Sequence, residues 1–152
     1  MQFVPGSENT ECINYIAVSP AENQSSRFLA VCERGREGEC GAKVTIYNDL
    51  RKKRIIPDQD AEVDHGINAM EFLGAAFSPK NVKEHLVTLS GAPDWEVIFW
   101  KWDTFKLLAR IKLNVVSPDL DPKTFTISMM GSSSGLRVVV TGEQTYRFMK
   151  VS

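Results

Sequence analysis

Apolar residues in this chain fall in short runs of three to nine residues, separated by polar segments. The runs are rich in Val, Ile, Phe, Tyr and Trp, and the segments between them in Gly, Pro, Asn, Asp and Ser. Branched and aromatic side chains favour strands, and the intervening residue types favour turns. The pattern predicts an all-β fold with strands at Ile13–Val18, Arg27–Glu33, Ala42–Tyr47, Arg54–Ile56, Ala69–Phe77, His85–Ser90, Glu96–Trp102, Leu107–Lys112, Thr124–Met130, Arg137–Thr141 and Thr145–Val151.

The pattern of strands repeats along the chain. Ala17–Pro20, with the sequence Ala-Val-Ser-Pro, returns 59 residues later as Ala-Phe-Ser-Pro at Ala76–Pro79. A polar stretch, a strand, a Gly-bearing loop and a further strand follow in each copy. Val87–Gly91 returns in similar form 51 residues later at Val138–Gly142. A repeat of this length indicates stacked supersecondary units.

Repeated units of four strands are typical of β-propeller blades, because one small sheet cannot bury both faces without stacking on its neighbours. We expect about two and a half blades of an incomplete propeller: blades at 12–64 and 65–118, and a partial blade at 119–152. Residues 1–11 are expected to form a tail or the last strand of a preceding blade. Propellers close with about four to eight blades, so the sequence looks truncated.

The dipeptide Trp102-Asp103 ends the third strand of the second unit, the position at which WD-repeat blades carry Trp-Asp. The chain therefore resembles a WD-repeat propeller. More closely, it resembles the N-terminal propeller of the cilia- and flagella-associated WD-repeat proteins. The matching segments, in order, are Phe3–Glu8, Ala17–Pro20, Arg27–Glu33, Val44–Tyr47, Ala76–Pro79, Val97–Trp102, Ala109–Ile111 and Val140–Gly142.

This resemblance implies a protein-interaction scaffold without enzymatic activity. The family carries propellers followed by a long coiled coil, and it helps to assemble or anchor inner dynein arms in motile cilia. The expected partners are other proteins, such as inner dynein arm or other axonemal components, and no cofactor is implied. The expected location is the cytoplasm and the axoneme of a cilium or flagellum.

Composition and charge fit this class. The 152 residues are 43% hydrophobic and 24% charged, with a net charge of −1, which is typical of a globular chain. No positive excess favours nucleic acid, and no apolar run is long enough to cross a membrane. Cys12, Cys32 and Cys40 are odd in number and lack paired spacing, so neither a disulfide framework nor a zinc site is expected. A reducing compartment suits them, and Met1–Glu11 does not resemble a secretory signal.

Residues that could support catalysis or metal binding are sparse. The chain has two histidines, His65 and His85, and neither stands in a pattern with a nucleophile and an orienting group. Gly131–Gly135 lacks the lysine of a phosphate-binding loop and is expected to be a hairpin loop. The alternating acids Asp58, Asp60, Glu62 and Asp64 lack the Gly and closing Glu of a calcium loop, which favours a solvated linker.

Two features are candidates for protein binding. Arg51, Lys52, Lys53 and Arg54 form the densest basic run, which could bind an acidic partner; the alternative is a solvated turn. Trp95 follows Pro93-Asp94 in a predicted loop, so it is a candidate contact residue; core packing is its alternative role.

A second class of protein fits the same length. A small β-barrel or sandwich could hold an apolar ligand in its interior. The repeat at 59 and 51 residues argues against it.

Overall fold

The computed structural model describes residues 9–20, 27–49, 51–58, 64–115 and 119–151. The predicted all-β fold is confirmed, because the described residues form eleven strands and two 3₁₀ helices of three residues each. No helix in these ranges is long and apolar enough to cross a membrane. The elements are β1 (Thr10–Val18), β2 (Phe28–Gly35), β3 (Lys43–Asn48), β4 (Arg51–Ile56), β5 (Phe72–Phe77), β6 (His85–Ser90), β7 (Glu96–Lys101), η1 (Trp102–Thr104), β8 (Lys106–Lys112), η2 (Pro122–Thr124), β9 (Thr126–Ser132), β10 (Gly135–Gly142) and β11 (Thr145–Val151).

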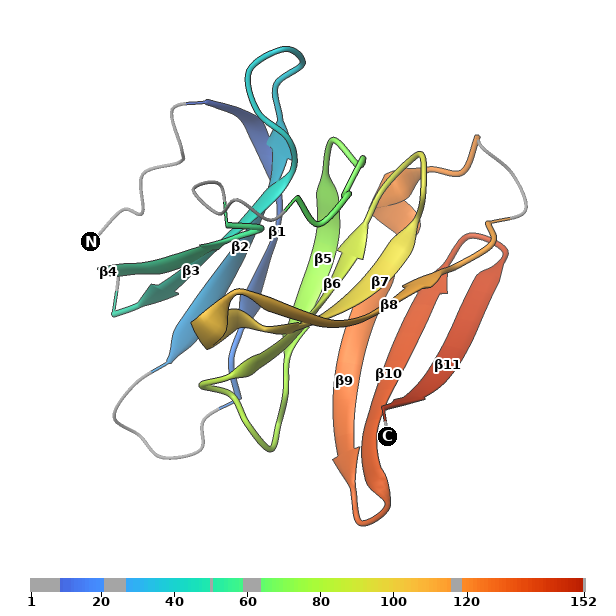
Figure 1. The fold of residues 1–152 in the computed structure, drawn as a ribbon. Coiled ribbons are helices and arrows are strands. Elements are labelled where there is room, and N and C mark those ends of the chain that lie inside the picture. Colours follow the sequence, from blue (N-terminus) through green and yellow to red (C-terminus); the bar gives the residue numbers. More distant parts are fainter. Residues whose placement is uncertain (1–8, 21–26, 50, 59–63, 116–118, 152) are drawn as a thin grey trace.

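The strands form three separate antiparallel sheets, each a meander in which neighbours in sequence pair with each other (Figure 1). The first sheet has the order β1-β2-β3-β4, the second β5-β6-β7-β8, and the third holds β9, β10 and β11. The first strands lie side by side, since β5 contacts both β1 and β9. The sheets do not close on one another, and they are consistent with consecutive partial propeller blades.

The sheets stack through two apolar cores, as the alternation of side chains along a strand requires. Phe28, Ile46, Phe72 and Trp100 belong to the core between the first and second sheets. Phe99, directly beside Trp100 in sequence, belongs to the core between the second and third sheets. The second sheet is therefore buried on both faces, and the predicted opposite orientation of Phe99 and Trp100 is confirmed.

The repeat seen in the sequence is also present in the geometry. The ladder between β3 and β4 has a bulge at Ile46 and Tyr47, and the ladder between β7 and β8 has one at Phe99 and Trp100. In each ladder the extra residue lies on the outer edge strand of a four-stranded sheet. The two ladders can therefore be superposed residue by residue, with Lys53 and Leu108 as the equivalent bulged residues.

The start of β4 differs from the sequence expectation. A strand was expected only from Arg54, whereas β4 begins at Arg51, so the basic run is a strand and not a solvated turn. β1 begins at Thr10, two residues before the expected start of the first unit. Residues 1–8 of the expected N-terminal tail lie outside the described residues, as do Asp60 and Glu62 of the acidic run.

The cysteines differ in accessibility, which leads to a prediction about thiol labelling. All three are free; Cys12 is exposed and Cys32 is fully buried in the first core. Burial, with a smaller contribution from Glu33, raises the pKa of the Cys32 thiol far above its usual value. We expect Cys32 to react with a thiol reagent at least about a hundredfold more slowly than Cys12, because labelling requires local opening. Mass spectrometry of timed alkylation measures this, and equal native rates would contradict the packing.

Candidate protein-interaction surface

The basic run Arg51–Arg54 occupies the outer edge of the first sheet. Its four side chains are exposed, and β4 hydrogen-bonds to β3 alone within the described residues. Arg54 differs from the others, because its guanidinium lies 5.1 Å from the ring centre of Phe105 and its Nε donates to the carbonyl of Asp103 at 3.3 Å. Arg54 therefore ties the edge of the first sheet to the turn that leads into β8.

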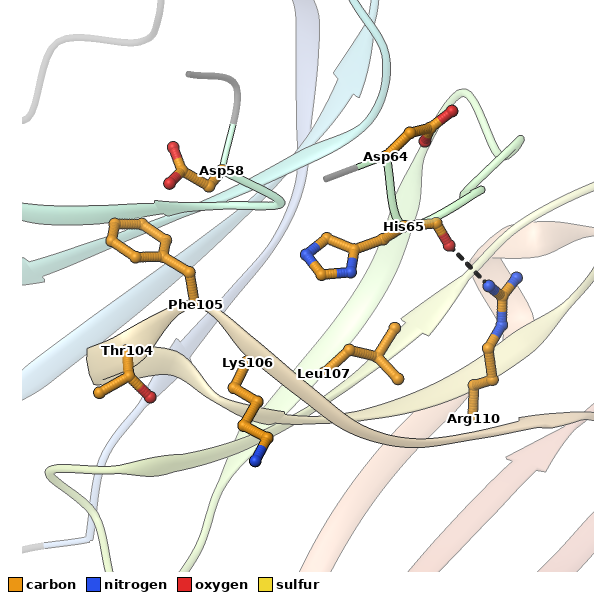
Figure 2. Close-up of a pocket in the computed structure, with 8 residues that line it drawn as sticks. All are labelled: Asp58, Asp64, His65, Thr104, Phe105, Lys106, Leu107 and Arg110. Atoms are coloured by element: carbon orange, nitrogen blue, oxygen red, sulfur yellow. Dashed lines mark hydrogen bonds between the residues drawn. The ribbon is translucent and has the colours of Figure 1, made fainter. Parts of the chain in front are cut away.

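A groove of about 750 Å³ lies beside this contact (Figure 2). Asp58, after β4, and the loop before β5 form one wall, and the η1–β8 segment forms the other. Its lining residues are Asp58, Asp64, His65, Thr104, Phe105, Lys106, Leu107 and Arg110. Two carboxylates and two cations surround an apolar base of Phe105 and Leu107. This mixture suits a peptide side chain that has both an apolar stem and a polar end.

Arg110 fixes one end of the groove. Its Nε and Nη2 donate to the carboxylate of Glu96 at 2.7–3.0 Å, and Glu96 is only 2% exposed. The remaining nitrogen, Nη1, donates to the carbonyl of His65 at 2.7 Å, the contact dashed in Figure 2. The guanidinium thus connects β7, β8 and the loop before β5. Because it is held from several sides, this end of the groove is rigid.

The buried polar link within the second sheet is centred on Trp100. Its indole Nε1 donates to the Thr88 hydroxyl at 2.9 Å, and the His65 ring packs edge-on against it at 5.6 Å. Trp102, of the Trp-Asp dipeptide, instead donates to the carbonyl of Val82 at 3.2 Å. The dipeptide therefore closes a turn, and the link between strands was not expected from the sequence.

Trp95 is not at the surface, which corrects one of the two expected candidates. Its side chain is 7% exposed, and its ring lies 5.0 Å from that of Phe125, in the core between the second and third sheets. The loop position was predicted correctly, but Phe125, between η2 and β9, packs over the loop. The exposed aromatic required for a contact hot spot is therefore missing at this position.

The other residues considered in the sequence take structural positions. His85 lies at the start of β6 with its ring against Phe99, and Nδ1 is 3.5 Å from the amide of Asn81. The Gly-Ser segment forms the turn between β9 and β10, so the predicted hairpin loop is confirmed. Asp58 and Asp64, at the ends of the acidic run, line the groove.

These sheets define a class: an all-β repeat protein built from blade-like antiparallel units. No family model matches the chain. The chain is similar to mouse "Cilia- and flagella-associated protein 57", at 26% identity over 153 residues. This alignment covers 98% of the chain but only 11% of the mouse protein, so the chain spans about a ninth of that relative's length.

Proposed function

We propose that the chain is a non-catalytic protein-interaction scaffold, part of a WD-repeat propeller in a protein of cilia or flagella. Its role is to help assemble or anchor inner dynein arms on the axoneme. The observation that carries the proposal is the similarity to the mouse ciliary protein along nearly the whole chain. The three consecutive antiparallel meanders support it, because they are consistent with partial propeller blades.

The outer faces of the first and third sheets add support. Ile16 and Val18 on β1 are about half exposed, and so are Met130 and Phe148 on the third sheet. Exposed apolar side chains on outward sheet faces are expected of repeat units that stack on further units. A scaffold of this kind binds partners through its loops and edges, which is where the basic run and the groove lie.

Cell fractionation tests this proposal. The tagged chain, expressed in motile ciliated cells within its full-length protein, is expected in the detergent-insoluble axoneme. Inner-arm dynein subunits are expected to copurify after salt extraction. An even cytosolic distribution with no axonemal protein recovered would overturn the proposal. A tagged soluble fluorescent protein of similar size serves as the control for non-specific retention.

The alternative of a closed ligand-binding barrel is wrong for the described residues. Their eleven strands form three separate sheets, so no continuous ladder encloses an interior. The two side-chain cores lie between the sheets, and a pocket of about 260 Å³ remains between the second and third sheets. The similarity to the mouse ciliary protein along nearly the whole chain favours the scaffold over a ligand-binding sandwich.

A further inference from the structure

We propose that Arg51, Lys52 and Lys53 on the edge strand β4 form a binding site for an acidic, extended polypeptide segment. The inference deepens the proposed scaffold function and rests on it only for its biological setting. Three observations support it: an equivalent edge strand forms without a run of cations, these charges are unpaired within the described residues, and the strand that carries them is held rigidly.

The internal repeat shows that an equivalent edge strand forms without a run of cations. Superposing the two ladders at their bulges aligns Arg51–Arg54 with Lys106–Ala109, whose sequence is Lys-Leu-Leu-Ala. The second sheet therefore forms the same edge strand with one cation where the first has four. Four consecutive exposed cations repel one another at this spacing. A partner with negative charge would relieve that repulsion.

Pairing differs between the two edge strands. On β8, Arg110 pairs with Glu96, and Lys112 lies 2.9 Å from Asp94. Within the described part of the chain, Arg51, Lys52 and Lys53 have no carboxylate within ion-pair distance. Their ammonium and guanidinium groups therefore remain available to an external anion.

The strand is held in place from one side. Arg54 packs on Phe105 and bonds to the Asp103 carbonyl, so its end of the run is fixed. A preorganised site loses less conformational entropy when a partner binds. The groove begins next to Phe105, so an acidic segment lying along β4 could place one side chain there.

The bulge at Lys53 determines how the partner would bind. Lysine and a bulge on an edge strand both oppose the addition of another strand. We therefore assign the recognition to side-chain charges rather than to backbone pairing. An extended partner rises about 3.3 Å per residue, so carboxylates at alternate positions recur about every 6.6 Å along one side of it.

Fluorescence anisotropy tests the site with a labelled twelve-residue peptide of alternating Glu and Gly, using the full chain. We expect saturable binding that weakens steeply between 50 and 200 mM salt, as charge-driven association does at about these ionic strengths. The triple variant R51Q/K52Q/K53Q is expected to bind at least about tenfold more weakly. The matching Gln-Gly peptide is expected not to bind.

A matched variant separates local recognition from net charge. K123Q/R147Q/K150Q removes the same number and type of cations from exposed positions of the η2 region and the third sheet. The proposed site would be wrong if the two triple variants lost peptide affinity equally. It would also be wrong if R51Q/K52Q/K53Q bound the peptide as tightly as the unsubstituted chain. Circular dichroism confirms that both variants fold. Binding of a DNA strand of equal charge as tightly as the peptide would also overturn the assignment to a polypeptide.

These outcomes are independent of the ciliary setting. If the peptide binds but the full protein does not reach the axoneme, the proposed function is wrong and the binding site stands. If the peptide does not bind, and R51Q/K52Q/K53Q leaves axonemal retention unchanged, the binding site is wrong and the scaffold function stands.

Discussion

Replacing Trp100 with alanine is expected to lower the free energy of unfolding by about 3–5 kcal/mol, the usual cost of truncating a buried aromatic side chain. Trp100 is completely buried between the first and second sheets, so its removal leaves a cavity that backbone hydrogen bonds keep from collapsing. It also leaves the Thr88 hydroxyl without its donor. Urea unfolding followed by circular dichroism measures the loss.

Two further variants make this prediction specific. Trp100→Phe keeps an aromatic ring but not the N–H, so a smaller loss of about 1–3 kcal/mol is expected if Thr88 is left unsatisfied. Tyr146→Ala removes a large side chain that is 63% exposed, and its effect is expected to stay within about 0.5 kcal/mol. A Trp100→Ala loss as small as that of Tyr146→Ala would show that the two sheets do not stack as described.

The strands could be predicted from the sequence because each apolar run is bounded by turn-forming residues. The exception is informative. β4 begins with four cations, and it was expected to begin three residues later. An edge strand needs a partner on one side only, and its outer residues need no apolar face. The local pattern of apolar residues therefore fails to predict the start of β4, because pairing to β3 rather than burial specifies this strand.

The polar contacts of the candidate surface could not be predicted, because they depend on register. Trp100 lies opposite Leu86 but bonds to Thr88, two residues along β6. Glu96 lies opposite Lys112 but pairs with Arg110. Both are diagonal contacts across a hairpin, and the shift of one position that a bulge introduces changes which side chains meet.

The burial of Trp95 shows a different limit. Its loop was evident from Pro93 and Asp94, but its burial depends on Phe125, thirty residues later in the segment that leads into the third sheet. No local signal distinguishes a loop covered by the next unit from one that faces solvent. In a repeat protein, the exposure of a loop is decided by the neighbouring unit.

Replacing Arg110 with methionine is expected to cost about 3 kcal/mol of unfolding free energy. Glu96 is 2% exposed, and without Arg110 its carboxylate would stay buried without its hydrogen-bonded cation. Breaking a buried pair costs about 3–5 kcal/mol, and the lower end applies here because the Arg110 side chain is 33% exposed. The loop before β5 would also lose the bond to the His65 carbonyl.

The double variant E96L/R110M distinguishes two causes of the expected loss of stability: the unpaired Glu96 carboxylate and the loss of packing. If the cost arises from the unpaired carboxylate, the second substitution should restore most of the stability, because an apolar pair of similar volume often replaces a buried ion pair at little cost. Lys112→Met is the matched control: its pairing with Asp94 is exposed at the lysine, so a loss below about 1 kcal/mol is expected. Equal losses for R110M and the double variant would locate the effect in packing and the His65 contact, and the buried charge would then contribute little.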